Sequence, residues 1–167
     1  MNLRTVEPGH YRAVIGRFAT GVCVVTVQGP EGPVGMTANA VCSVSLEPLL
    51  LLVCFDSGAR TLGLVRGTSR FGVNVLAEQQ QALATLFASK LPETEKFAGV
   101  PHRMHDGVPV LEGALAWLGC DLTELVPAGD HVIGIGAVDV AEAGDGEPLV
   151  WYRGGYGRFV PTTIPPP

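Results

Sequence analysis

The sequence contains little charge and no long hydrophobic run, and these absences narrow the class of protein. Only 16% of its 167 residues are charged and 47% are hydrophobic, which disfavours a disordered chain or a coiled coil. The longest uninterrupted apolar stretch, Leu49–Phe55, has seven residues, whereas a bilayer-spanning helix needs about 20. The formal net charge of −5 argues against a nucleic-acid surface, because such a surface is basic. We therefore expect a globular protein with neither a membrane nor a nucleic acid as partner.

The sequence also lacks paired cysteines and an apolar leader. Its four cysteines, Cys23, Cys42, Cys54 and Cys120, have no C-x-x-C spacing, which argues against a zinc knuckle or a thioredoxin motif. Each cysteine lies inside an apolar run, so we expect four free thiols that are buried as small hydrophobes. The first residues contain no apolar signal segment, and we expect a cytoplasmic location.

Hydrophobic periodicity predicts a mainly β chain with short helices. Apolar residues recur at three- and four-residue spacing in three segments, 11–18, 61–66 and 78–89, which are predicted helices. The predicted strands are Val22–Val27, Val34–Val41, Leu49–Phe55, Phe71–Leu76, Ala114–Leu122, His131–Val140 and Leu149–Tyr152. Because Leu49–Phe55 is too apolar for a half-exposed strand, we expect it at the centre of the fold. Residues 90–109 contain three prolines and mixed charge, and are predicted to form a long loop.

The order of these elements favours one architecture. The predicted strands follow one another in neighbouring pairs and do not alternate with helices, so the pattern favours an antiparallel barrel of six to seven strands with peripheral helices over a doubly wound sheet. We find neither an internal repeat nor a domain linker. The prediction is a single domain over residues 1–159, followed by an extended proline-rich tail over residues 160–167.

Motifs of nucleophilic, phosphate-loop and metal chemistry are absent. The sequence has no G-x-S-x-G elbow, no Gly-Lys-Ser/Thr phosphate loop and no H-E-x-x-H. The Gly134-Ile-Gly136 fragment of a dinucleotide fingerprint falls inside a predicted strand, where that motif does not work. His102 and His105 lie between prolines in the predicted polar loop, where histidine is tolerated, so we predict no metal site.

Several polar segments remain, and each has two interpretations. In one interpretation, residues 36–40 and 43–45 form a polar strip that faces a planar ligand. In the other, their polar side chains only bond to neighbouring backbone groups. Residues 56–61 are an anion site at a helix N-terminus, or an ordinary cap by Ser57 or Asp56. His131 is expected either to point into a cleft or to lie at the surface. Tyr156 is expected either to stack on a ring or to lie at a loop tip.

Taken together and in order, these segments resemble the flavin reductase-like family. The resemblance runs from about Tyr11 to Tyr156. It rests on Phe18–Val22, Gly35–Ala40, Ser43–Pro48, Arg60–Leu62, Arg70–Leu76, Lys96–Val100, Gly129–His131 and Arg153–Tyr156.

The resemblance implies a fold and a reaction. The implied fold is a split β-barrel of the FMN-binding type. The implied activity is that of an NAD(P)H:flavin oxidoreductase, which transfers hydride from the nicotinamide C4 of NADH or NADPH to the flavin N5 of FAD or FMN. Members of the family commonly release free reduced flavin to a separate flavin-dependent monooxygenase, and they are usually homodimers.

The resemblance also implies roles for particular residues. The isoalloxazine ring and the ribityl chain would be cradled by Thr37, Ala38, Asn39, Ala40, Ser43, Val44 and Ser45. Backbone amides near Val44 and Ser45 would stabilise reduced flavin. The flavin phosphate would be held by Ser57, Arg60 and Thr61, and serine often stands in the family where this chain has Ala59. Phe97 and His131 would lie where the nicotinamide stacks, and Tyr156 is a further cofactor contact.

Two other interpretations stay open. The chain could be a non-catalytic flavin-binding module for storage or sensing, which would not need the nicotinamide side at Phe97 and His131. It could also be a structural barrel whose polar strip only satisfies backbone groups. The choice between FAD and FMN, and between NADH and NADPH, is open as well.

Overall fold

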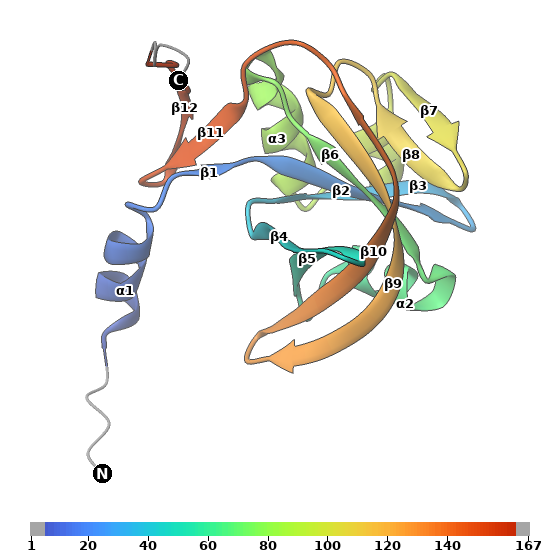
Figure 1. Ribbon diagram of the computed structural model, residues 1–167, viewed down its shortest axis with the longest axis horizontal. Coiled ribbons are helices and arrows are strands. Elements are labelled where there is room, and N and C mark those ends of the chain that lie inside the picture. The colour runs from blue at the N-terminus through green and yellow to red at the C-terminus, as the bar shows by residue number, and fades with distance from the viewer. Residues whose placement is uncertain (1–5, 163–167) are drawn as a thin grey trace.

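The computed structural model describes residues 6–162 and is mainly β (Figure 1). Within these residues the helices are α1 (Pro8–Ile15), α2 (Arg60–Thr68), α3 (Gln81–Ala88) and α4 (Glu93–Phe97), with a 3-10 turn η1 (Glu78–Gln80) before α3. The strands are β1 (Thr20–Gly21), β2 (Cys23–Gly29), β3 (Gly32–Ala38), β4 (Val41–Leu46), β5 (Leu49–Asp56), β6 (Arg70–Val75), β7 (His102–His105), β8 (Val108–Leu111), β9 (Ala116–Ala128), β10 (His131–Ala143), β11 (Leu149–Tyr152) and β12 (Gly155–Arg158). The predicted mainly β class with short helices is confirmed.

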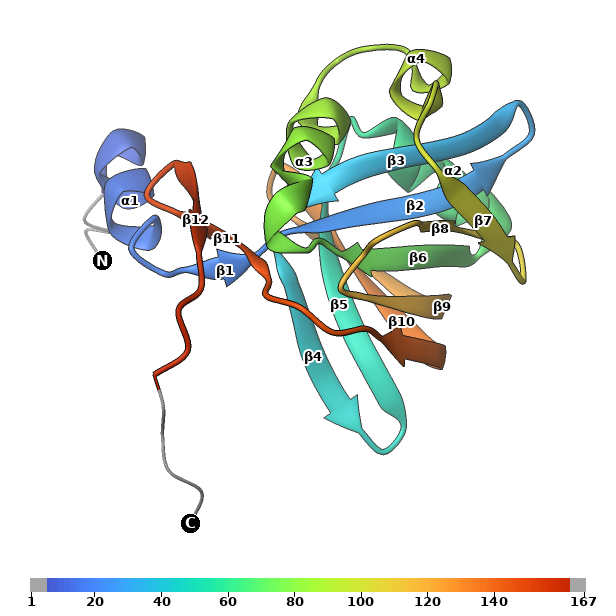
Figure 2. The same cartoon turned by 90° about the horizontal axis from the view of Figure 1, so that it is seen from above.

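The strands of the described chain form three antiparallel sheets. The largest has seven strands in the order β3-β2-β6-β9-β10-β5-β4. A second sheet has the order β1-β11-β12, and β7 pairs with β8. Figures 1 and 2 show that α1 and the small β1-β11-β12 sheet project from the side of the larger body. The predicted antiparallel pairing is confirmed.

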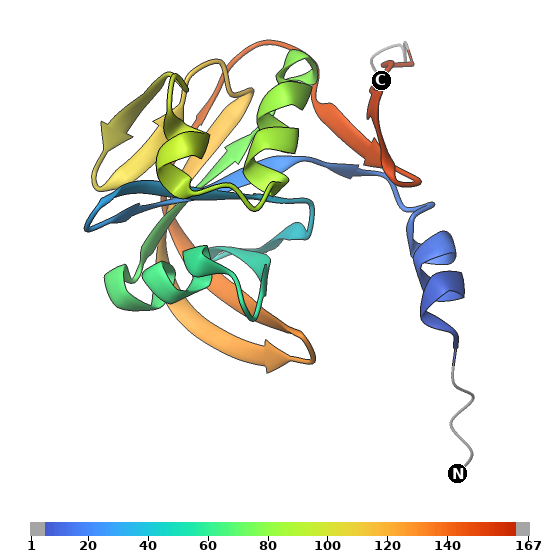
Figure 3. The same cartoon turned by 180° about the vertical axis from the view of Figure 1, so that it is seen from behind.

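The core occupies the inner face of the large sheet and the space beneath α3. Phe55 and Phe71 meet edge to face on the inner side, with ring centroids 6.1 Å apart. On the other face of β2, Val24 packs with Leu76 and Phe87 in a second cluster. Figure 3 shows α3 lying over this part of the sheet. Because successive side chains of a strand point to opposite faces, β2 is buried on both sides and supplies both clusters.

The prediction that Leu49–Phe55 lies at the centre of the fold is wrong. β5 is the second strand from the edge of the large sheet, and only its alternate residues Leu51, Val53 and Phe55 are buried. Its other face is partly exposed. The sequence pattern could not distinguish a strand buried on two faces from one whose second face is apolar and open.

The same open face corrects the expectation for two cysteines. Cys42 on β4 is exposed, and Cys54 on β5 is half-buried, whereas Cys23 and Cys120 are buried. All four are free thiols. Burial raises the pKa of the Cys23 and Cys120 thiols to about 12, because a thiolate is poorly solvated there.

The predicted loop over residues 90–109 is also wrong, because it contains α4, β7 and the start of β8. Two of the three prolines that suggested a loop stand where no backbone N–H is needed. Pro92 is the N-cap residue of α4, and Pro109 lies in β8, which pairs only with β7. The carbonyl of Pro109 accepts a hydrogen bond from Thr26 Oγ1 at 2.6 Å and so ties this hairpin to the core.

Other boundaries differ from the predictions. The first helix runs over Pro8–Ile15 and does not extend to residue 18, and none of its residues is buried. β4 and β12 were not predicted, and β9 and β10 are longer than expected. Of the predicted tail, residues 160–162 have no regular secondary structure, and residues 163–167 lie outside the described residues.

Candidate functional site

A cavity of about 740 Å³, here called the main cleft, lies between β3, the loop before α2, and the segment from α3 to α4. Its walls include Gly35–Thr37 from β3, residues 56–61 without Ser57, and residues 87–93 with Lys96. Segments far apart in the sequence thus bring polar backbone and a helix N-terminus to one place.

The loop that precedes α2 is folded by its own hydrogen bonds. Asp56 Oδ1 accepts from the backbone N–H of Gly58 at 2.8 Å, and the Asp56 carbonyl accepts from the N–H of Ala59 at 2.9 Å. The N-cap residue of α2 is Ala59, whose side chain makes no cap hydrogen bond. An ordinary cap by Ser57 or Asp56, one of the two interpretations of this segment, is therefore not formed. Helix α2 begins at the main cleft without a side-chain cap, which suits an anion.

The two candidate phosphate ligands on α2 differ in exposure. Thr61 is 2% exposed and lines the cleft wall, whereas the Arg60 side chain is 62% exposed. Arg60 lies 4.0 Å from the carboxylate of Glu31, at the turn between β2 and β3. Such an exposed pair contributes little free energy, so Arg60 is available to a stronger anion.

The polar residues of β3 divide between the cleft and its surroundings. Thr37 lines the main cleft, and its hydroxyl donates to the Ala84 carbonyl of α3 at 2.6 Å. Ala38 points the opposite way into the core and is 8% exposed. The Asn39 amide donates to Thr20 Oγ1 at 3.3 Å.

A smaller recess of about 190 Å³ adjoins the main cleft and shares Thr37 and Ala88 with it. Asn39, Trp151 and Tyr156 also line this recess. The rings of Trp151 and Tyr156 meet edge to face with centroids 4.9 Å apart. The structure therefore brings Tyr156 together with Thr37 and Asn39, although more than a hundred residues separate them in the sequence.

Ser43, Val44 and Ser45 lie on the edge strand β4, outside the walls of the main cleft. The pairing of β4 with β5 is irregular between Ser43 and Ser45, and the Ser45 hydroxyl accepts from the Glu47 N–H at 3.1 Å. Ala40 lies in a different cavity of about 560 Å³, here called the arm pocket, beside the end of α1.

His131 is the first residue of β10 and lies directly beside the loop that precedes α2. It pairs in register with Asp56, and the Ser57 N–H donates to the Asp130 carbonyl at 3.0 Å. The His131 Nδ1 lies 2.8 Å from Asp130 Oδ1, and this hydrogen bond holds the pKa of the Asp130 carboxyl below its usual value. The imidazole is 44% exposed and does not line the main cleft.

Phe97 is 8% exposed and packs between Phe87 and His102 at centroid distances of 4.9 and 5.2 Å. A Cβ added at Gly35 would lie 2.9 Å from the Phe87 ring, so glycine lets the two phenylalanines approach β3. Phe97 is therefore part of the wall that shapes this region of the protein.

Two further cleft residues, Glu93 and Lys96, were not among the candidate site residues of the sequence analysis. Lys96 is 6% exposed, and its Nζ lies 3.0 Å from Glu93 Oε1. Glu93 Oε2 accepts from the Gly35 N–H at 3.0 Å, a donor that the edge strand β3 would otherwise leave unpaired. The three-residue spacing of an acid and a base was visible, but the segment was predicted as a loop.

Two searches of the described residues gave no site. No group of three or more His, Cys, Asp or Glu side chains within residues 6–162 is arranged to hold a metal ion. No helix in the same part of the chain is long and apolar enough to cross a membrane.

The structure is a mainly β domain in which the start of α2, without a side-chain cap, lines the main cleft. Residues 15–159 match the family described as flavin reductase like domain, and the chain belongs to that family.

Known relatives cover nearly the whole chain. A flavin reductase of Pseudomonas putida is 40% identical over 157 residues, covering 92% of this chain and 91% of that protein. An NADH-dependent flavin reductase of a Rhodococcus species is 40% identical over 154 residues, covering 90% and 86%. Among solved structures, the NADH:FAD oxidoreductase SgcE6 of Streptomyces globisporus C-1027 superposes with a TM-score of 0.88 at 36% identity, covering 96% of this chain and 100% of that one.

Proposed function

We propose that this chain is an NAD(P)H:flavin oxidoreductase that reduces FAD or FMN and supplies free reduced flavin to a separate flavin-dependent monooxygenase. The observation that carries this proposal is the main cleft, where α2 begins without a side-chain cap beside Arg60 and Thr37. Relatives include the reductase component of a 4-nitrophenol monooxygenase of Rhodococcus opacus and the monooxygenase reductase subunit HsaB of Mycobacterium tuberculosis, 39% and 36% identical to this chain.

The residues of the cleft fit a flavin phosphate. The first backbone N–H groups of α2 and the exposed guanidinium of Arg60 are donors, and an anion is favoured at a helix N-terminus. A bound flavin supplies the capacity to accept hydride, so the protein needs no nucleophile of its own. Thr37, Asn39 and Tyr156 line the adjoining recess and would fix the orientation of the ring. Ser43–Ser45 on β4, outside the walls of the main cleft, remain predicted cofactor contacts.

His131 is proposed to orient the nicotinamide dinucleotide. Its support is its place beside the loop that precedes α2: His131 pairs with Asp56, and the carbonyl of Asp130 accepts from the Ser57 N–H. Asp130 holds the ring through a 2.8 Å hydrogen bond. We expect His131→Ala to raise the KM for NADH and to leave the KM for flavin unchanged. An unchanged KM and turnover with NADH would remove His131 from this role.

The experiment that tests the function is anaerobic mixing of the protein with NADH or NADPH and excess free FAD or FMN. Loss of the visible flavin absorbance over many turnovers is the expected result. It would also rank the two flavins and the two donors. Flavin binding without reduction by any donor would refute the reductase and favour the non-catalytic binding module.

A homodimer is part of the same proposal. Three exposed apolar side chains follow one another along α1 and the residues after it: Tyr11, Val14 and Phe18. On β4, Leu46 is 84% exposed. The arm pocket is lined by Phe18 from the first of these surfaces and by Cys42 from β4. Light scattering is expected to give a dimer for the wild type and a monomer for Leu46→Glu, with Met104→Glu on β7 as the exposed control. A wild-type monomer would refute the proposal.

We also propose that the large sheet closes as a split barrel. Its two edge strands, β3 and β4, are joined by only Asn39 and Ala40, so the edges must approach each other at that end. The Cys54 N–H donates to the Ala40 carbonyl at 3.0 Å, so the pairing of β4 with β5 extends into this short connection. A single domain over residues 1–159 and a cytoplasmic location remain predictions from the sequence.

A further inference from the structure

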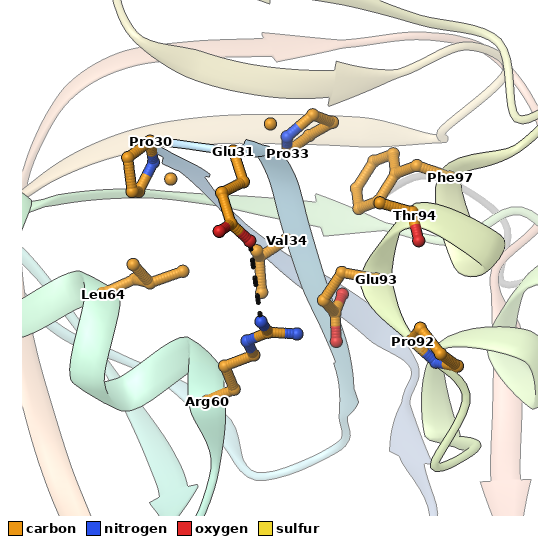
Figure 4. Close-up of a pocket in the computed structure, with 12 residues that line it drawn as sticks. Pro30, Glu31, Pro33, Val34, Arg60, Leu64, Pro92, Glu93, Thr94 and Phe97 are labelled. Carbon is orange, nitrogen blue, oxygen red and sulfur yellow. Dashed lines mark ion pairs between the residues drawn. The ribbon is translucent and has the colours of Figure 1, made fainter.

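A carboxylate lies in the wall between two cavities of the protein. A second cavity of about 420 Å³, here called the side pocket, lies next to the main cleft and shares Arg60, Pro92 and Glu93 with it (Figure 4). Figure 4 shows the Arg60 guanidinium and the Glu93 carboxylate facing the same space. Arg60 is the first residue of α2, where a phosphate is proposed to bind. A phosphate at this helix end therefore meets a negative charge as well as a positive one.

The Glu93 side chain is fixed in this wall by two partners. Its Oε2 accepts from the Gly35 N–H at 3.0 Å, and its Oε1 accepts from the Lys96 ammonium at 3.0 Å. Only 12% of its side-chain surface is exposed, so salt and water screen its charge poorly. Asp56, the other acid of the main cleft wall, is exposed and is screened more strongly.

The same pair withholds a cation from the cleft. Lys96 lines the main cleft, but its ammonium is bonded to Glu93 and only 7% of its side chain is exposed. An unpaired ammonium in this place would attract a phosphate strongly, because both charges would be poorly solvated. With Lys96 paired, the cations that the wall offers to a phosphate are Arg60 and Lys90, and both are exposed to solvent.

We propose that Glu93 is an affinity-limiting residue: its carboxylate neutralises Lys96 and repels the flavin phosphate, so that flavin binds weakly and reduced flavin leaves the protein in each cycle. The proposal rests on the proposed function, because it needs the flavin phosphate at the start of α2. A reductase that supplies free reduced flavin must release its product. Differences in affinity between related complexes lie mostly in the dissociation rate, so Glu93 acts on that step.

Paired variants separate the charge of this wall from its structure. Glu93→Gln removes the negative charge, keeps an amide oxygen for the Gly35 N–H and leaves the Lys96 ammonium free to attract a phosphate. Lys96→Met has the opposite effect, because the Glu93 charge is then unpaired. The double variant carries neither charge. Glu95→Gln is the matched control, because Glu95 belongs to the same helix, is exposed and lines neither cavity.

Titration with riboflavin, FMN and FAD measures affinity without turnover, and stopped-flow displacement gives the dissociation rate. Riboflavin has no phosphate, so it isolates the effect on the phosphate. In Glu93→Gln we expect FMN and FAD to bind about tenfold more tightly and to dissociate about tenfold more slowly, with riboflavin unchanged. In Lys96→Met their affinity should fall by about the same factor, and the double variant should stay within about threefold of the wild type. Lower stability cannot produce this pattern, because an unfolding protein binds every flavin less tightly.

Three results would overturn the proposal. An unchanged or lower affinity of Glu93→Gln for FMN and FAD would show that this charge does not limit binding. Equal tightening of riboflavin would assign the effect to the shape of the cleft. An effect of the same size in Glu95→Gln would reduce it to the net charge of the protein. If Glu93→Gln does not fold, Lys96→Met decides, and an affinity for FMN and FAD that does not fall overturns the proposal. Failure of the wild type to bind or reduce any flavin would instead refute the proposed function.

Discussion

The buried ion pair between Glu93 and Lys96 gives a prediction whose size follows from the structure. Both side chains line the main cleft, with 12% and 7% of their side-chain surfaces exposed. Glu93→Gln keeps the size of the side chain and an amide oxygen for the Gly35 N–H, so it removes only the negative charge. The Lys96 ammonium is then left buried without its partner.

Removing one member of a buried ion pair costs about 3–5 kcal/mol. We expect about 3 kcal/mol for Glu93→Gln, the lower end, because the open cleft gives Lys96 some access to water. Lys96→Met leaves Glu93 its bond from the Gly35 N–H and should cost about 2 kcal/mol. The double variant buries no charge, so it should lose only about 2 kcal/mol, which is a coupling energy of about 3 kcal/mol.

The assay is unfolding in urea without ligand, followed by circular dichroism, since guanidinium salts would screen the ion pair. Glu95→Gln on the exposed side of α4 is the control and should stay within about 0.5 kcal/mol of the wild type. A loss below about 1 kcal/mol for Glu93→Gln, or single-variant losses that simply add in the double variant, would refute the reasoning.

Alkylation of the native protein should modify exposed Cys42, whereas buried Cys23 and Cys120 should react only on unfolding, as mass spectrometry would show. Burial raises the pKa of these two thiols from 9.0 to about 12, so as the pH rises the unfolded chain loses their protons before the folded chain does. The free energy of unfolding measured in urea should therefore fall from pH 9 toward pH 12. Constant stability over that interval would contradict the prediction. Gly136→Ala places a methyl group 2.7 Å from a buried phenylalanine ring and should cost about 1–3 kcal/mol, unlike Gly157→Ala in open space.

The sequence alone determined most elements of the fold. The predicted helix over residues 78–89 is present as η1 and α3, and the runs Val22–Val27 and Phe71–Leu76 correspond to β2 and β6. These elements follow from local periodicity, since a helix or strand that buries one face repeats its apolar residues at a fixed spacing. The ordered motifs also identified the family, because the flavin reductase like match covers residues 15–159.

Only the tertiary structure decided which apolar faces are covered. Tyr11, Val14 and Phe18 form an apolar stripe at helical spacing, and all three side chains are exposed in the structure. The run Leu49–Phe55 looked fully buried, yet its strand β5 lies next to the edge strand β4 of the large sheet. Periodicity records that a face is apolar, and it does not record what covers that face.

The site was likewise assembled by contacts that no local pattern contains. The Gly35 N–H finds its acceptor on Glu93, 58 positions along the chain, and Thr37 bonds to Ala84, 47 positions away. The uncapped start of α2 depends on Asp56 turning its carboxylate to Gly58. The sequence supplies the donors and acceptors, but their pairing is set by the packing of α3, α4 and the loop before α2 around β3, because a hydrogen bond forms only where the fold brings the two groups within about 3 Å.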